Sequence, residues 1–222
     1  KIQFVDRSVL ERESVSKRHQ GFIARATEFD YCEVEDILAE SKRRGEDAFV
    51  VILDGIEDPH NLGSIFRVCE CAGVHGVIIP KNRAASVNDT AVRTSAGASQ
   101  YVKVARVANL SNAIATLKKA GLWVFCADMD GREITEFNLK GPLALVIGGE
   151  DRGVSRLVKE NCDGAVSIKM KGKINSLNAS VACGVAVFEA LKHCVELTQF
   201  ISRKLSNFVC VNIVHAYSER VF

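Results

Sequence analysis

Short, almost wholly apolar runs alternate along this chain with longer segments in which apolar residues recur every three or four positions. Five of the runs predict strands, and they span residues 49–54, 76–80, 122–127, 143–148 and 165–170. Because these runs lack a polar face, we expect each strand to be covered on both sides, as the strands of parallel sheets are.

Four other segments have the spacing of amphipathic helices, namely residues 62–72, 110–120, 154–161 and 177–192. Strand, helix and strand in repetition predict an α/β fold, a parallel sheet flanked by helices. The last helix is predicted to carry one apolar stripe, which consists of Leu177, Val181, Val185, Phe188 and Leu191. Asn175 or Ser176 is expected to cap this helix.

Composition excludes several classes of protein. The 222 residues are 47% hydrophobic and 25% charged, which provides for one substantial core. A net charge of +2 is too small to indicate nucleic-acid binding by bulk charge, so any RNA surface must be local. The apolar runs fall far short of the roughly 20 residues that cross a bilayer, and no membrane span is expected. The eight cysteines form no CxxC pair, which favours reduced thiols and a cytoplasmic protein.

Three loops that follow predicted strands carry polar residues and glycines, at the edge where open parallel sheets bind ligands. The loop after the first strand leads into a helix that carries Arg67. The loop after the fourth strand is GGEDRG, and places Glu150 among glycines that let a ligand approach the backbone. The loop after the fifth strand contains Ser176, Asn178 and two lysines.

Each of these features also has a simple structural explanation. Arg67 can lie in solvent on its helix, and Glu150, Ser176 and Asn178 can cap helices. GGEDRG does not match GxGxxG and stands late in the chain, which disfavours a dinucleotide-binding domain. No GxSxG turn accompanies His60, so a hydrolase with a serine nucleophile is disfavoured as well.

Taken together and in this order, three segments resemble motifs one to three of the SpoU, or TrmH-type, RNA 2′-O-ribose methyltransferases of the SPOUT superfamily. They read DPHNLGSIFRVCECAG, LALVIGGEDRGVS and SIKMKGKINSLNASVACGVAVFEAL, and the resemblance covers residues 48–191. Upstream, FVDRSVLERESVSKRHQGFIARA resembles the segment that precedes the catalytic domain in the 23S rRNA guanosine methyltransferases of this family. The resemblance thus implies a remnant of a substrate-recognition domain in residues 1–46, a catalytic domain in residues 47–194 and a tail of unknown role in residues 195–222.

The resemblance also implies a C-terminal deep trefoil knot that binds S-adenosyl-L-methionine, and a homodimer with the knot and the last helix at its interface. That helix would then be partly interfacial rather than wholly core. The cofactor-binding positions carried over from the family are Thr94, Ser95, Gly97, Gly148, Gly149, Ile168, Met170 and Leu177. Backbone groups and apolar side chains at such positions suit an adenine ring.

The catalytic set implied by the resemblance is Asn61, Arg67, Glu150, Ser176 and Asn178. The family assigns removal of the hydroxyl proton to arginine, yet a guanidinium ion has no free lone pair to accept a proton, which makes Arg67 a poor base. We therefore expect Arg67 to bind the phosphate beside the target ribose and to stabilise the developing alkoxide. Ser176 and the two asparagines would position it, and Glu150 would orient the network.

RNA is the implied partner, and no metal is expected because the sulfonium carries its own leaving group. Cations near the site are the candidates for RNA contacts, namely Arg83, Arg93, Arg152, Lys171 and Lys173. The predicted reaction is methyl transfer to a ribose 2′-hydroxyl, on a guanosine of 23S rRNA because the upstream segment favours rRNA. The alternatives are a tRNA ribose methyltransferase and a non-catalytic RNA-binding knot protein, and the complete catalytic set argues against the second.

Overall fold

The computed structural model describes residues 2–14, 19–23, 29–174 and 176–194. These residues belong to two compact units, which divide between Asp30 and Tyr31. The smaller unit contains helix α1 (Arg7–Glu13), which buries none of its residues. The larger unit contains the sheet and all other helices.

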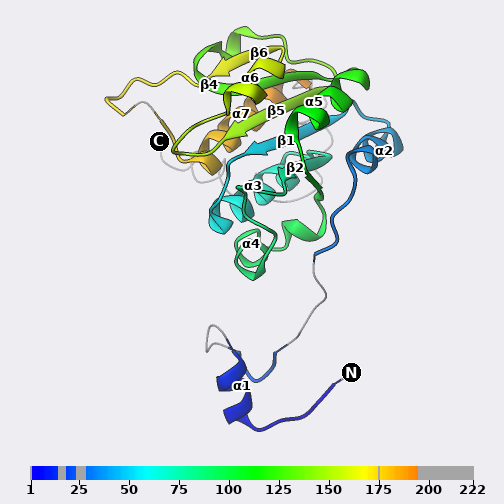
Figure 1. The fold of residues 1–222 in the computed structure, drawn as a ribbon, viewed down its shortest axis with the longest axis vertical. Helices are drawn as coiled ribbons and strands as arrows, with labels where there is room; N and C mark the ends of the chain where they lie inside the picture. The colour runs from blue at the N-terminus through cyan, green and yellow to red at the C-terminus, as the bar shows by residue number, and fades with distance from the viewer. Residues whose placement is uncertain (1, 15–18, 24–28, 175, 195–222) are drawn as a thin grey trace, which may run out of the picture. The chain divides into compact units, whose positions relative to one another are not determined.

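Six strands form one sheet in the described part of the larger unit (Figure 1). They are β1 (Phe49–Asp54), β2 (Gly76–Pro80), β3 (Lys103–Val107), β4 (Trp123–Glu133), β5 (Leu143–Gly148) and β6 (Gly164–Ser167), in the order β3-β2-β1-β5-β4-β6. Every pair of neighbours is parallel, so the predicted parallel α/β fold is confirmed. In the centre, β1 and β5 pair along their whole length, and Asp54 lies opposite Gly148.

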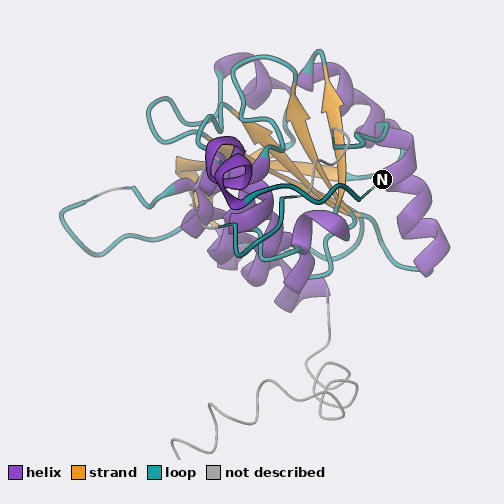
Figure 2. Cartoon of the chain, turned by 90° about the horizontal axis from the view of Figure 1, so that it is seen from below, coloured by secondary structure: helices purple, strands orange, loops and turns teal. Residues whose placement is uncertain are grey.

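Helices cover both sides of the strands, as Figure 2 shows. They are α2 (Val34–Arg44), α3 (Pro59–Cys71), α4 (Asp89–Thr94), α5 (Leu110–Lys119), α6 (Arg156–Asn161) and α7 (Ala179–Cys194), with short 3₁₀ helices η1 (Ala98–Gln100) and η2 (Ile134–Glu136). The apolar faces of α2, α5 and α6 pack on one face of the sheet in a single buried cluster. Helix α3 contacts both α4 and α7, and α7 also contacts β5.

The structure corrects several predicted elements. Strand β3 was not predicted because Lys103 and Arg106 interrupt its apolar run at the edge of the sheet. Strand β4 runs on to Glu133 because it pairs with β6 beyond an irregularity in the register. Strand β6 ends at Ser167, three residues before the predicted end. The short helices α1 and α4 were also not predicted.

Three residues of the predicted apolar stripe lie on the exposed face of α7. Of the predicted stripe, Val181, Val185 and Phe188 are 50%, 40% and 43% exposed. The buried residues of this helix are instead mostly small, namely Ala179, Cys183, Ala186, Val187 and Ala190. Small side chains let α7 approach α3 closely, and the position of a Cβ on Gly184 lies 3.6 Å from Val68 Cγ2. The largest apolar side chains are therefore left on the outer face.

The predicted cap of α7 is wrong. Asn178, rather than Asn175 or Ser176, accepts hydrogen bonds at its Oδ1 from the backbone N–H groups of Ser180 (3.0 Å) and Val181 (3.3 Å). Asn175 itself lies outside the described residues. None of the helices in the described ranges is long and apolar enough to cross a membrane.

Candidate active site

The three polar loops meet at the carboxyl edge of the sheet, because β1 and β5 are parallel neighbours and α7 begins beside their ends. The loop after β1 runs into α3, whose first turn is fixed by two features. Asp58 accepts a hydrogen bond from His60 N at 2.8 Å, and Pro59 occupies the first helical position. Asn61 therefore stands in the first turn of α3 and faces the loop that follows β5.

A hydrogen-bonded network joins Asn61, Glu150 and Asn178. Glu150 Oε1 accepts from Asn61 Nδ2 at 3.0 Å and from Asn178 Nδ2 at 2.5 Å. It also accepts from the backbone N–H of Ala179 at 3.3 Å. Asn178 Nδ2 lies 2.9 Å from Asn61 Oδ1, which closes the triangle. One carboxylate thus ties together three segments that are far apart in the sequence.

Asn178 has two structural tasks in this network. Its Oδ1 caps α7, while its Nδ2 donates to Glu150. Because the cap fixes the orientation of the amide, the donor points at the carboxylate in a defined geometry. The start of α7 is thereby bound to the loop after β5.

The other two predicted catalytic residues lie outside this network. Arg67 is exposed on α3 and makes no hydrogen bond or ion pair with any residue that the structure describes. Ser176 is also exposed, and it has no hydrogen bond to another described residue. Three of the five predicted catalytic residues are therefore brought together, and two remain free for a ligand or a partner.

Gly148 and Gly149 hold the loop after β5 against the neighbouring backbone. A Cβ on Gly148 would lie 2.1 Å from the carbonyl carbon of Gly153, and one on Gly149 would lie 2.2 Å from Gly55 O. Gly149 N also donates to Asp54 O at 2.9 Å. A side chain at either position would force these backbones apart, so the two glycines are required by the loop itself.

Thr94 and Ser95, in the segment expected to support the cofactor, have their hydroxyls engaged within the fold. Ser95 is fully buried, and its hydroxyl donates to Val92 O at 2.7 Å. The Thr94 hydroxyl lies 3.3 Å from His60 Nδ1. Any contribution of these residues to a cofactor would come from their backbone groups.

The segment from Ile168 to Leu177 has features that fit an adenine-containing cofactor. The side chains of Ile168, Met170 and Leu177 are half-buried. Outside the helices and strands, the backbone N–H groups of residues 168–174 make no hydrogen bond to another described residue. Apolar surface and unused backbone groups side by side are what a planar, polar-edged ring requires.

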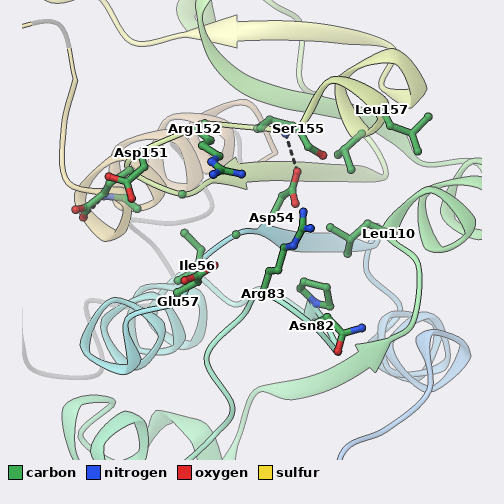
Figure 3. A pocket seen from close by; sticks show the side chains of 18 of the residues that line it. Asp54, Ile56, Glu57, Asn82, Arg83, Leu110, Asp151, Arg152, Ser155 and Leu157 are labelled. Carbon is green, nitrogen blue, oxygen red and sulfur yellow. Dashed lines mark hydrogen bonds between the residues drawn. The ribbon is translucent and has the colours of Figure 1, made fainter.

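A cavity of about 990 Å³ opens between the loops after β1, β2 and β5 (Figure 3). Asn61 and Glu150 line it, as do Arg83 and Arg152 among the predicted RNA-binding cations. The other three, Arg93, Lys171 and Lys173, do not line it. Asp54 lines it too and was not predicted, although a polar residue at the carboxyl end of a buried strand is a recognisable signal.

No cluster of three or more potential metal ligands occurs among residues 2–14, 19–23, 29–174 and 176–194. The features that the structure does show at the strand ends are a fixed carboxylate, two oriented amides, a segment suited to a nucleoside cofactor and a cavity with arginines. Open parallel sheets bind ligands at this edge, so these groups define an α/β protein with a candidate ligand-binding site there.

Comparison with known proteins identifies the family. The chain belongs to the SpoU rRNA Methylase family, which matches residues 48–188. This confirms the predicted family, and the matched range agrees with the resemblance over residues 48–191.

Relatives and solved structures agree with this assignment. The chain is 43% identical over 193 residues to "Putative TrmH family tRNA/rRNA methyltransferase YacO" of Bacillus subtilis, which covers 86% of this chain and 77% of the relative. It is 40% identical over 195 residues to "23S rRNA (guanosine-2'-O-)-methyltransferase RlmB" of Photorhabdus laumondii, with 86% and 78% covered. The SpoU methyltransferase AviRb from Streptomyces viridochromogenes, crystallised with the cofactor AdoMet, superposes with a TM-score of 0.62 at 31% identity. That superposition covers 66% of this chain and 58% of AviRb.

Proposed function

We propose that this chain transfers the methyl group of S-adenosyl-L-methionine to the 2′-hydroxyl of a guanosine ribose in 23S rRNA. The observation that carries the proposal is the network of Asn61, Glu150 and Asn178, which joins all three motif loops at the sheet edge. The choice of guanosine and of 23S rRNA is supported by the upstream segment and by the similarity to RlmB. A ribosomal substrate places the reaction in the cytoplasm.

The cofactor would lie against the segment from Ile168 to Leu177. Ile168 and Leu177 would cover the faces of the adenine, and backbone groups of Gly148 and Met170 would bind its edge. Gly149 and the backbone of Thr94, Ser95 and Gly97 would support this site. When bound, S-adenosyl-L-methionine supplies a methyl group activated by its sulfonium.

The chain's own residues would position the ribose and manage the charge that develops on its oxygen. Arg67 is exposed and unpaired within the described residues, so its guanidinium is available for the phosphate beside the target ribose. It would also stabilise the negative charge on the 2′-oxygen as the proton leaves. Ser176, which lies within motif three, would assist. Because Glu150 Oε1 already accepts three N–H groups, its first task is to orient both asparagines.

We further infer that the C-terminal part of the catalytic domain, which we place at residues 47–194, forms a deep trefoil knot. Strand β6 pairs only with β4 at the sheet edge, yet α7 returns to contact α3 and β5 nearer the centre. Such a return path after the last strand supports threading through an earlier loop. We assign residues 1–46 to the remnant of a recognition domain, although the compact unit with the sheet already begins at Tyr31.

We also propose that the protein is a homodimer that pairs through the outer face of α7. Val181, Val185 and Phe188 leave on this face the apolar surface that an interface would bury.

The decisive experiment is methyl transfer from radiolabelled S-adenosyl-L-methionine into 23S rRNA and, separately, total tRNA, both from cells that lack the gene. We expect one alkali-resistant labelled site in 23S rRNA, with label lost in Arg67→Ala and strongly reduced in Arg67→Lys because lysine cannot form the two-pronged contact. Label in tRNA alone would show that the substrate is tRNA rather than 23S rRNA. No label in either RNA, from protein that binds the cofactor by calorimetry, would favour the non-catalytic alternative and overturn the proposed reaction.

A further inference from the structure

The cavity in Figure 3 shares two lining residues, Asn61 and Glu150, with the catalytic network. Pro80, at the end of β2, and Asn109, which follows β3, line it as well. Of the eight expected cofactor-binding positions, only Gly149 is part of its wall. At about 990 Å³ it has room for a nucleotide, and a group held there would abut the catalytic residues.

Asp54 presents a fixed acceptor to this cavity. It is the last residue of β1, and its Oδ2 accepts a hydrogen bond from Ser155 N at 2.8 Å. Its backbone oxygen accepts from Gly149 N at 2.9 Å, so both the strand end and the side chain are held in place. The second carboxylate oxygen, Oδ1, makes no hydrogen bond within the described part of the chain. Figure 3 shows the carboxylate directed into the cavity.

Arg83 presents donors to the same space. It follows β2, and its backbone has φ of +55°, an unfavourable conformation for a residue other than glycine. Its guanidinium forms no hydrogen bond or ion pair with any residue that the structure describes. In Figure 3 the side chains of Arg83 and Asp54 point into one region of the cavity, with Arg152 beside them.

Acceptor and donors in this arrangement complement one base in particular. Guanine carries the N1–H and N2–H₂ donors on one edge and the O6 and N7 acceptors on the other, and arginine is its commonest specific partner at O6 and N7. Adenine places the acceptor N1 where guanine has N1–H, so a carboxylate there would repel it. Cytosine and uracil lack the N7 acceptor altogether. Unpaired RNA bases are read through hydrogen bonds to these edges.

We propose that the cavity binds the base of the target nucleotide and selects guanine, with Asp54 accepting from N1–H and N2–H₂ and Arg83 donating to O6 and N7. This inference rests on the proposed function, because it assumes that the ribose of the same nucleotide meets the catalytic network. It assigns to Asp54 and Arg83 a role in specificity that is separate from methyl transfer.

The test is equilibrium binding of nucleoside 5′-monophosphates to the full chain by ligand-observed NMR. Asp54→Asn is the informative variant, because the amide oxygen still accepts from Ser155 N while a donor replaces the free acceptor. We expect the unmodified chain to bind the guanosine nucleotide roughly tenfold more tightly than the inosine nucleotide, which lacks the N2 amino group. In Asp54→Asn this difference should disappear. Asp47→Asn makes the same change of charge at the other end of β1 and should preserve the difference.

Arg83 is tested independently with the 7-deazaguanosine nucleotide, which lacks the N7 acceptor. The unmodified chain should bind it several-fold more weakly than the guanosine nucleotide, and Arg83→Gln should bind the two alike. This second comparison still tests the guanine pocket if Asp54→Asn fails to fold, a failure that its melting curve would reveal.

Equal binding of all four common bases, or an inosine discrimination that survives in Asp54→Asn, would overturn the guanine pocket. Methylation mapped to an adenosine, cytidine or uridine would overturn it too. A guanosine preference without methyl transfer to RNA would retain the pocket and reject the proposed reaction. Methyl transfer to guanosine without any preference among the mononucleotides would reject the pocket and retain the proposed reaction.

Discussion

Asn178 combines a helix cap and a donor to Glu150 in one side chain, so its two tasks are separable by substitution. Serine caps a helix about as well as asparagine, yet it has no amide to reach the carboxylate. A change at this one residue therefore distinguishes the stability of α7 from the orientation of the network. Asn61 offers no such separation, because among the described residues its side chain hydrogen-bonds only to Glu150 and Asn178.

We expect Asn178→Ser to lower methyl transfer to 23S rRNA on the order of 100-fold, because a misplaced network no longer holds the ribose in line. Its free energy of unfolding should change by less than about 1 kcal/mol, because the cap is kept. Ser180→Ala is the matched control, since it removes a hydroxyl that bonds to Asn178 but makes no contact with Glu150. Single-turnover kinetics and urea unfolding measure both quantities. Full turnover in Asn178→Ser would show that the network is not needed for catalysis.

His75 is a buried titratable residue that lies beside Phe49, at the start of β1. It is 3% exposed, and its Nδ1 accepts a hydrogen bond from Phe49 N at 3.0 Å, so Nε2 carries the proton and faces Glu46. Burial, with the nearby Arg44 charge, lowers the pKa of His75 below its ordinary value of about 6.5. The unfolded chain therefore takes up a proton at this residue at a higher pH than the folded chain does.

The unfolding free energy should consequently fall as the pH drops from about 6.5 towards the lowered pKa of His75. Urea unfolding at a series of pH values between 7.5 and 5 measures this loss. In His75→Gln the loss should be smaller, because that side chain does not titrate. An equal fall of the unfolding free energy with pH in both proteins would contradict the role given to His75.

At the scale of elements, the position of α3 depends on glycines that differ in their surroundings. A Cβ on Gly63 would lie 2.5 Å from Ala91 O and 2.7 Å from Thr94 Cβ, so α3 and α4 would have to separate. A Cβ on Gly184 in α7 would meet Val68 at 3.6 Å, an ordinary contact. One glycine is thus required by packing, and the other is not.

Gly63→Ala should therefore destabilise the protein by roughly 1–3 kcal/mol, since overpacking outweighs the better helix propensity of alanine. Gly184→Ala should stabilise it by up to about 1 kcal/mol, because only the propensity term remains. Thermal or urea unfolding should show changes in the free energy of unfolding of opposite sign for the two variants. A stabilised Gly63→Ala variant would mean that α3 and α4 move apart freely.

Elements also show where sequence reasoning works and where it fails. The strands β1, β2 and β5 were predicted with their observed bounds, because buried parallel strands are continuous apolar runs. The buried face of α7 was not identified, because periodicity points to large apolar residues whereas the buried residues of this helix are mostly small. Asn61, Glu150 and Asn178 were grouped through ordered motifs. Asp54 carried a recognisable signal at the carboxyl end of a buried strand, but the sequence does not show that this strand end opens into a cavity.

At the scale of the whole molecule, the exposed apolar stripe on α7 points to a contact with a second copy of the chain. Large apolar residues that the core does not use are still present at helical spacing on one exposed face. A second copy of the chain can cover such a face by a twofold contact, in which the same patch serves both partners. The outer face of α7 and Arg67 would then lie near one boundary between the copies.

We expect the full chain to sediment as a dimer at micromolar concentration in analytical ultracentrifugation. Phe188→Glu should shift it to a monomer, because an unpaired carboxylate would be buried at the centre of the interface. Met129→Glu is the matched control, since Met129 is 67% exposed on β4 and lies outside α7. That variant should remain dimeric. If the unmodified chain is a monomer at every concentration, the apolar stripe has another use, and Arg67 must act within a single chain.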